Sequence, residues 1–433
     1  WLKVSSAQLL PVGTKVAMYG AWPRHGTGVL PAFTAIIFMR GITVGVIGTS
    51  SMLIAEQSGL PQNQLIAARG LGLVLGPSLF SWVVSRMVWC GESQSGTAFL
   101  LGIKALCEYT IPRTFSAPLL YSSFFILGLA MTMLDTTKNA LVTRVFGEGC
   151  GLPLNVYEVL YGVGAMLAPL VSVVMPEQAW NLLVAIDLAL AAVVAGKRTC
   201  RGKPRNWKVK VRGIKALDSG SSSPATPTRV PRRVLTTGLV FLVIVQACET
   251  AMSAWAFTYA TAVLGLPRKV CATFPMTFYL AFTITRFVCL PLSAWLPPST
   301  ILQASTALLL SGATLLRCIT CFMGHGEATG LLLLCVALVG VGTCPLYAMT
   351  LASIRRHGEL TAQELGWYQT SSALGNTLGL WLPGLVSLPV AQQLWAVCAF
   401  LVISASARDF PWWISSLPGK AACFDSDNVA LGA

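Results

Sequence analysis

The residues of this sequence with the greatest capacity for chemistry are charged side chains inside long apolar stretches. An ionised side chain at the centre of a membrane-spanning helix costs roughly 2.5 to 3.5 kcal/mol if it faces lipid, so we expect such residues to pair, line water or face a protein interior. The side chains of this kind are Asp135, Lys138, Glu158, Asp187, Glu249 and Arg286. Left unpaired, they would together outweigh the stability of a typical fold.

Asp135, Lys138 and Glu158 are spaced so that they can meet. With a rise of about 1.5 Å per residue, the first two lie within roughly 14 Å of the end of their segment, and Glu158 lies a few residues into the next segment from the same side. One interpretation is an ion-pair network that holds two helices together. The other is an element that binds H⁺ or Na⁺ and couples an ion gradient to solute movement, since a buried carboxylate beside a cation suits that chemistry.

The other charged residues are interpreted one by one. Glu249 has no evident partner on its own segment, which favours a functional role, and Arg286 is its simplest counter-charge or a gate residue. Asp187 is best explained by snorkelling or by pairing with a neighbour, and Lys104 and Glu108, four residues apart, are expected to pair on one helical face. We predict ion coupling by Asp135, Lys138, Glu158 and Arg286.

Contacts to a polar solute need hydrogen-bonding groups together with flat apolar faces. Residues of these types occur in several of the apolar segments. The predicted substrate-binding set is Asn139, Asn155, Glu249, Trp255, Tyr259, Gln369 and Asn376. The alternative for any single Asn or Trp is packing between helices.

These residues are positioned by twelve apolar segments of about 20 residues, the length that crosses a bilayer core. Of the 433 residues, 55% are hydrophobic and 11% are charged, and the mean hydropathy is +0.68, which leaves too little polar surface for a water-soluble chain. Segments this long are helices rather than barrel strands. We predict an all-α membrane protein with 12 transmembrane helices in two pseudo-symmetric six-helix bundles. The expected spans are 32–55, 64–84, 96–112, 117–143, 153–174, 178–196, 234–264, 270–295, 299–321, 328–353, 363–387 and 389–407.

A basic stretch from Lys197 to Arg233 separates two halves that resemble each other. Trp82 and Trp295, Arg144 and Arg356, and Gly164 and Gly379 stand at near-equal separations in the sequence, as expected for a duplicated bundle. The predicted organisation is an N-terminal segment at 1–31, a first bundle at 32–196, a linker at 197–233, a second bundle at 234–407 and a C-terminal tail at 408–433.

The distribution of Lys and Arg over short loops predicts the orientation, because cytoplasmic loops retain these residues. It places both termini and the basic stretch on the cytoplasmic side of a plasma or organelle membrane. The basic stretch accounts for most of the net charge of +14, so nucleic acid is not expected as a partner. It is interpreted as a tether that fixes topology, and the alternative is that Trp207 and its basic neighbours lie on anionic lipid.

The other reactive residues do not suggest a catalytic or metal site. The cysteines are scattered through apolar segments and are expected to pack as small apolar side chains, and Cys318 and Cys321 lack partners for zinc or redox chemistry. The 3 histidines lie in loops or near segment ends. Because no nucleophile, base and orienting group occur together, we expect neither an enzyme nor a metal or cofactor site.

Short motifs along almost the whole chain give a resemblance to a known family. They are Ala68-Arg69-Gly70-Leu71-Gly72, Leu134-Asp135-Thr136-x-x-Asn139, Pro153-Leu154-Asn155-x-x-Glu158, Glu249-x5-Trp255-x3-Tyr259, and Arg286 followed by Leu290-Pro291-Leu292-Ser293. On these motifs the chain resembles the major facilitator superfamily, and within it the branch of sodium-dependent glucose transporter-like proteins and fucose/galactose/hexose symporters.

The resemblance implies two bundles that rock around a central site and take up a hexose-like solute together with a cation, Na⁺ or H⁺. It implies cavity roles for Asp135, Asn139, Asn155, Glu249, Trp255 and Tyr259. The chain departs from the branch on the fifth helix, where Asn155 and Glu158 stand in place of the usual Gln and His. Lys138 adds a charge beside the Asp/Asn motif, and it can replace a cation electrostatically.

We therefore expect a secondary active transporter of a sugar or similar small polar solute, monomeric in the lipid bilayer and working by alternating access. The first alternative is a carrier of an organic anion or other metabolite, favoured by the positive charges of Arg69, Lys138 and Arg286. The second is a non-transporting sensor or scaffold that kept the fold.

Overall fold

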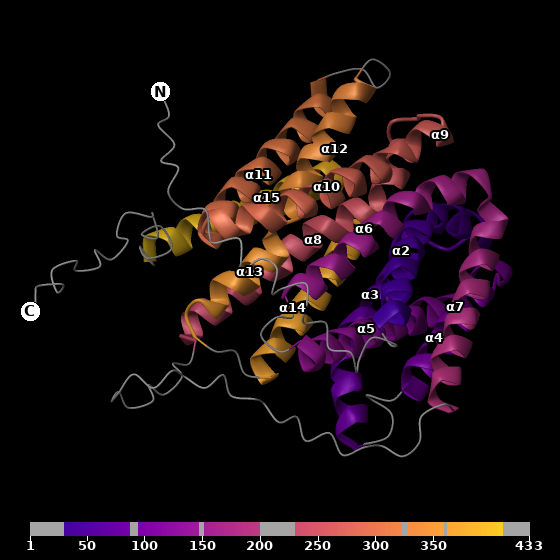
Figure 1. Cartoon of the computed structure of the whole chain (residues 1–433). Helices are drawn as coiled ribbons and strands as arrows, with labels where there is room; N and C mark the ends of the chain where they lie inside the picture. The colour runs from indigo at the N-terminus through magenta and orange to yellow at the C-terminus, as the bar shows by residue number, and fades with distance from the viewer. Residues whose placement is uncertain are drawn as a thin grey trace, which may run out of the picture.

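The architecture is that of a computed structural model, which describes residues 30–86, 94–146, 151–199, 230–322, 328–358 and 362–409. These residues form long helices that lie side by side (Figure 1). The helices of the first half are α2 (Leu30–Ser58), α3 (Gln62–Arg86), α4 (Gln94–Thr110), α5 (Ala117–Phe146), α6 (Gly151–Val174) and α7 (Pro176–Thr199). Those of the second half are α8 (Arg232–Ala262), α9 (Arg268–Cys271), α10 (Thr273–Trp295), α11 (Pro298–Phe322), α12 (Thr329–Thr343), α13 (Leu346–Arg355), α14 (Ala362–Trp381) and α15 (Leu388–Asp409).

Each of the twelve apolar segments predicted from the sequence overlaps at least one helix of the described chain, and the spans 234–264 and 363–387 run past the ends of α8 and α14. By length and composition, 8 of the spans are apolar enough to cross a membrane. Helices α3, α4, α10 and α14 are not among them. All four carry charged or amide residues discussed below, Arg69 on α3, Lys104 and Glu108 on α4, Arg286 on α10, and Gln369 and Asn376 on α14. These polar groups lower the hydropathy of their helices, and α4 is also short, at 17 residues.

Helices at matching positions of the two halves pair in the same way. In the first half α2 packs against α6, α3 against α5 and α4 against α7. In the second half α8 packs against α14, α10 against α12 and α11 against α15. The order of these pairs along the chain is identical in both halves, as a duplicated bundle requires.

Two of the glycines matched between the halves occupy equivalent places in this packing. A Cβ on Gly164 of α6 would overlap the carbonyl oxygen of Phe38 on α2, and a Cβ on Gly379 of α14 would overlap that of Ala247 on α8. Close backbone approach at small residues is how membrane helices gain packing contacts. Each glycine therefore permits the closest helix pair of its own half.

The two halves meet along three helix pairs, α3 with α14, α6 with α10 and α2 with α8. In Figure 1 the first half, indigo to magenta, lies against the second half, salmon to yellow. Near the ends of α2 and α8, Gln62 Nε2 donates hydrogen bonds to Ser51 Oγ and to Thr258 Oγ1, both at 2.9 Å. Farther along, Thr377 Oγ1 donates to Gly70 O at 2.7 Å. The bonds from Gln62 to Thr258 and from Thr377 to Gly70 join the two halves, whereas the bond from Gln62 to Ser51 lies within the first half.

The tenth predicted span is broken into α12 and α13 at Cys344 and Pro345. Proline has no backbone N–H and its ring crowds the preceding turn, so it interrupts the ladder of helical hydrogen bonds. The short helix α13 begins directly after this break and carries Tyr347.

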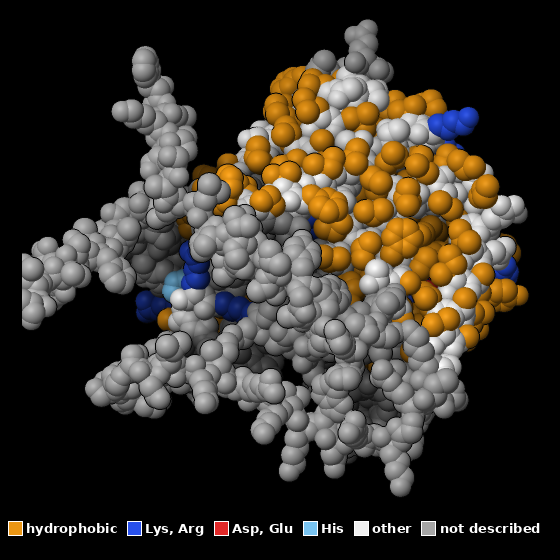
Figure 2. Space-filling view, viewed as in Figure 1, with side chains coloured by type: hydrophobic (Ala, Val, Ile, Leu, Met, Phe, Trp, Pro, Cys, Tyr) orange, Lys and Arg blue, Asp and Glu red, His pale blue; other side chains and the backbone are white. Residues whose placement is uncertain are grey.

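Much of the outer surface is apolar, as a lipid-facing protein requires. Figure 2 shows one face on which hydrophobic side chains predominate and Lys and Arg appear at only a few places. Side chains on the outside of the described part of the chain include Phe99, Phe115, Trp295, Phe322 and Leu401, each more than half exposed. We infer that lipid covers this surface.

Candidate functional site

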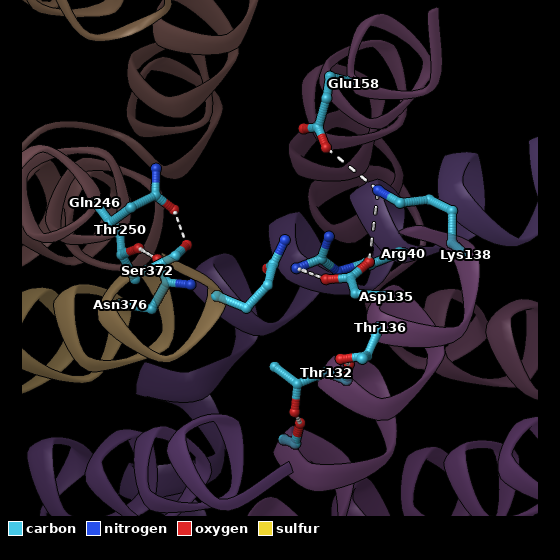
Figure 3. Close-up of polar contacts among 12 residues, drawn as sticks. Arg40, Thr132, Asp135, Thr136, Lys138, Glu158, Gln246, Thr250, Ser372 and Asn376 are labelled. Atoms are coloured by element: carbon cyan, nitrogen blue, oxygen red, sulfur yellow. Dashed lines mark hydrogen bonds and ion pairs between the residues drawn. The ribbon is translucent and has the colours of Figure 1, made fainter. Parts of the chain in front are cut away.

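A polar cavity of about 90 Å³ lies between the two halves. Its lining comes from the first half through α2, α3, α5 and α6, and from the second half through α8, α10, α13 and α14. A space of this size holds several water molecules. Figure 3 shows polar side chains of the two halves facing one another, with Arg40, Asp135, Lys138 and Glu158 on one side and Gln246, Thr250, Ser372 and Asn376 on the other.

The first half supplies a chain of ion pairs to this cavity. Arg40 on α2 lies 2.5 Å from Asp135 on α5, and its guanidinium carbon lies 5.2 Å from the centre of the Tyr161 ring. Lys138 lies 4.0 Å from Asp135 and 3.3 Å from Glu158 on α6. Asp135, Lys138 and Glu158 therefore come together as their spacing predicts, and Lys138, only 2% exposed, is the central cation.

Arg286 on α10 of the second half adds a further member to this series of ion pairs. Its Nη1 lies 3.6 Å from Glu158 Oε2, and its guanidinium carbon lies 4.6 Å from the centre of the Phe282 ring. The ion-pair partner of Arg286 is therefore Glu158 rather than Glu249, the counter-charge expected from the sequence. Glu158 thus accepts contacts from a cation of each half.

Glu249 has a partner on its own helix, which the sequence interpretation did not foresee. Gln246 Nε2 donates to Glu249 Oε2 at 3.0 Å, and Gln246 Oε1 accepts from Ser372 Oγ at 3.1 Å. This arrangement fixes the Gln246 amide between a carboxylate and a hydroxyl. Glu249 lines the cavity together with Arg286.

Amide and hydroxyl groups complete the wall on the second half. Thr250 Oγ1 donates to Asn376 Oδ1 at 2.7 Å, and Gln369 Nε2 donates to the Tyr347 hydroxyl at 3.4 Å. Asn139 lines the cavity from the first half. Four members of the predicted substrate-binding set, Asn139, Glu249, Gln369 and Asn376, are thereby brought to one cavity.

The other predicted members lie elsewhere. Trp255 and Tyr259 are buried on α8 and are not part of the cavity wall formed by the described residues. Trp255 Nε1 donates to Leu380 O at 2.9 Å, so its indole packs against α14. The side chain of Asn155 falls outside the described part of the structure.

Two charged cavity residues of the first half, Arg40 and Arg69, were not among the predicted site residues, although the charge of Arg69 was noted in favour of an anion carrier. Arg40 lies in the middle of the first apolar span. Its charge makes it a candidate for the same reason as the six charged residues named in the sequence analysis. Arg69 on α3 is 5% exposed and lines the cavity, and no carboxylate of the described chain lies within ion-pair distance of it. Its Nε is buried without a hydrogen-bond partner among the described residues.

The charges of the cavity wall do not cancel. Arg40, Arg69, Lys138 and Arg286 face three carboxylates, those of Asp135, Glu158 and Glu249. With every group ionised the wall carries a net charge of one positive unit. Such a cavity attracts an anion or a solute with several acceptor oxygens.

Comparison with known proteins gives one family and several related folds. The sequence profile of the Major Facilitator Superfamily matches residues 29–380. Among curated protein sequences none matches the chain.

Solved structures of similar fold cover most of the chain. The nucleoside transporter NupG has a TM-score of 0.62 at 12% identity, over 88% of this chain and 99% of that one. The E. coli fucose:proton symporter FucP has a TM-score of 0.59 at 17% identity, over 88% of this chain and 98% of that one. A structure described as informing substrate recognition in proton-dependent oligopeptide transporters has a TM-score of 0.64 at 13% identity, over 90% and 99%. At these identities the likeness is one of fold.

Proposed function

The chain belongs to the Major Facilitator Superfamily, as a multi-pass membrane transporter rather than an enzyme, and from this premise we propose that it moves a small polar solute, most simply a sugar, across a membrane by alternating access coupled to a cation. The two helical halves, 32–196 and 234–407, rock around the cavity between them. The cavity is the solute site.

The observation that carries this proposal is the composition of the cavity wall. Both halves present neutral hydrogen-bonding groups to the same space, Thr132 and Asn139 from the first and Gln246, Gln369 and Asn376 from the second. Solutes rich in hydroxyl groups need donors and acceptors on several sides. Because the contacts come from both halves, rocking of the halves changes the site. The names of two proteins of similar fold, a nucleoside transporter and a fucose:proton symporter, agree with this class of solute.

Coupling to Na⁺ or H⁺ is proposed on the chain of ion pairs. Asp135 Oδ1 and Oδ2 face Lys138 and Arg40, and Glu158 faces Lys138 and Arg286. A proton or metal cation that binds one of these carboxylates competes with the neighbouring cation, and the ion pair rearranges. The competing interpretation is that the same ion pairs only hold the helices together and bind no coupling ion.

The surroundings of the transporter are proposed from the sequence. We keep the orientation with both termini and the linker 197–233 on the cytoplasmic side, and a monomer in the lipid bilayer of a plasma or organelle membrane. Protease access to the two termini in sealed vesicles of known sidedness tests the orientation.

The direct test is uptake of labelled hexose into proteoliposomes, with and without a Na⁺ gradient or a pH gradient. Hexose accumulation that follows either gradient and falls in Gln369→Ala and Asn376→Ala supports the proposal. Gln178→Ala, a change at an exposed polar side chain of α7, is the matched control and keeps wild-type uptake. Binding of hexose without any uptake contradicts transport and favours a sensor.

A second candidate function is transport of an organic anion. It is favoured by Arg69, whose buried Nε has no hydrogen-bond partner among the described residues, in a wall with an excess positive charge. The same vesicles loaded with labelled carboxylates or phosphate esters distinguish the two, because uptake of anions and not of hexose supports this candidate alone.

A further inference from the structure

A second cluster of charged side chains is buried inside the first half, away from the solute cavity. Its charged members, which we call the triad, are Lys104 and Glu108 on α4 and Asp187 on α7. Lys104 Nζ donates to Glu108 Oε1 at 2.7 Å, to Thr43 Oγ1 at 2.9 Å and to Asp187 Oδ2. Glu108 and Asp187 are each 0% exposed.

The hydrogen bonds of the triad define the charge of the lysine. An ammonium group has three hydrogens and no acceptor, and Lys104 Nζ has three acceptors around it, one on each of α2, α4 and α7. All three hydrogens are therefore used, and Lys104 is a cation. The Thr43 hydroxyl has a single hydrogen, which reaches either Met39 O at 3.0 Å or Glu108 Oε1 at 2.9 Å.

The two carboxyl groups then leave an imbalance. If both are ionised, the triad carries one net negative charge in the interior of a membrane-spanning bundle. Glu108 Oε2 and Asp187 Oδ1 are buried and accept no hydrogen bond from any described residue. A buried charge without a compensating partner is strongly disfavoured. One additional proton on either of these two oxygens makes the triad neutral.

Neighbouring groups do not supply the missing positive charge. Arg40 on α2 and Asp135 on α5 share a small space with Lys104 and Asp187, and they form an ion pair with each other. The cation without a carboxylate partner in the cavity wall, Arg69, does not line that space. On α4 the adjacent titratable group is the buried thiol of Cys107. The additional proton must therefore come from solvent.

This small space separates the triad from the solute cavity. The space has a volume of about 10 Å³ and is lined by Arg40, Asp135, Lys104 and Asp187 together with five apolar side chains. That is about the room that one water molecule needs. Arg40 and Asp135 also line the solute cavity, so the small space lies between the cavity and the triad.

We propose that the triad is a proton-binding site, at which one proton rests on Glu108 or Asp187 and exchanges with the solute cavity through a single water. The proton passes from cavity water to Asp135, from Asp135 to the water in the small space, and from that water to Asp187 Oδ1. Release follows the reverse path, and no other reactant is consumed. Binding of the proton stands independently of the proposed function, whereas its use as the coupling ion rests on that function.

Infrared difference spectra of the reconstituted protein, taken between neutral and alkaline pH, test the site directly. Wild-type protein is expected to show the carbonyl stretch of a buried protonated carboxyl group, shifted in D₂O. Asp187→Asn and Glu108→Gln each leave one lysine and one carboxylate, a neutral pair that needs no proton, so both are expected to fold and to lose this band. Glu56→Gln removes an exposed carboxyl on α2 and keeps the band. Absence of the band in folded wild-type protein, or its persistence in both triad variants, overturns the proposal.

Uptake separates this inference from the proposed function. Asp187→Asn is expected to lose accumulation driven by a pH gradient while retaining solute exchange at equal pH. If wild-type uptake does not respond to pH although the infrared band behaves as expected, proton coupling fails and the proton site stands. If the variant lacks the band and still accumulates solute with the pH gradient, the triad is not the coupling site.

Discussion

Glu158 on α6 and Arg286 on α10 form an ion pair, 3.6 Å apart, that joins the two halves across the solute cavity. The same carboxyl group lies 3.3 Å from Lys138. One carboxylate is therefore shared between a cation of each half, and any movement that separates α6 from α10 must break one of its contacts.

Removal of this shared carboxylate leaves two buried cations facing each other. We expect Glu158→Gln to reduce solute uptake at least about tenfold and to lower the free energy of unfolding by about 1 to 3 kcal/mol, since a buried charge loses its partner. Uptake in proteoliposomes and thermal unfolding in detergent measure the two effects. The double variant Glu158→Arg with Arg286→Glu should have a higher uptake than either single variant. Wild-type uptake in Glu158→Gln would contradict a role for the ion pair between Glu158 and Arg286.

Neutralisation of Asp135 tests the coupling element. Asp135→Asn leaves Arg40 without the anion that lies 2.5 Å from it, and the amide cannot take up a proton. We expect concentrative uptake to be abolished while exchange of labelled for unlabelled solute is partly retained. Both rates are measured in the same vesicles, with Glu56→Gln as the control for loss of one carboxyl group. Unchanged gradient-driven accumulation would remove Asp135 from the mechanism.

Substitution of Arg69 distinguishes the two classes of solute. A hydrogen bond to a charged group contributes about 1.5 to 3 kcal/mol, so for an anionic solute we expect Arg69→Gln to raise KM roughly 10- to 100-fold. For a neutral hexose the change should be several times smaller. Arg268→Gln, at an exposed arginine of the second half, is the control. Equal KM values for an anion in wild type and in Arg69→Gln would exclude the anion carrier.

Gly48 lies where α2 of the first half crosses α8 of the second. A Cβ at this position would come 2.5 Å from Ser253 O, a backbone atom that cannot move aside cheaply. We therefore expect Gly48→Val to push α2 away from α8 and to favour a conformation in which the two halves are separated near this crossing. The readout is labelling of Thr258→Cys by a membrane-impermeant maleimide, with the exposed Cys318 and Cys321 removed, and labelling should increase severalfold.

A matched variant inside one half separates this shift from simple instability. Gly164→Val strains the pair α2 and α6, which belong to the same half, so it should lower thermal stability without exposing Thr258→Cys. If both variants gave the same labelling, the contact at Gly48 would not report on the relative position of the halves.

The course of the helices could be predicted from the sequence because an apolar run of bilayer length has few alternatives. The pairing of Lys104 with Glu108 could be predicted for a similar reason, since residues four apart meet on any helix. The partner of Asp187 could not be predicted, because it is a residue of another helix far away in the chain, and only the packing of α4 on α7 brings Lys104 to it.

The direction in which side chains point was harder to predict. Trp255 was expected in the cavity, but α8 is apolar on both its interior and its lipid side, so the sequence does not define how the helix is rotated about its axis. Arg40 was missed for another reason, because it was not counted among the charged residues inside the apolar segments, although its charge marks it in the same way. Charged residues were the better guide, because only an interior with partners stabilises them.

The interruption at Pro345 separates the part of the cavity wall that carries Tyr347 from helix α12. Tyr347 sits two residues beyond the break, lines the cavity and accepts a hydrogen bond from Gln369. Helix α13 has 10 residues and begins directly after the proline. Because the ladder of helical hydrogen bonds is interrupted at the proline, a tilt of α13 against α8 and α11 would carry Tyr347 with it and leave α12 intact.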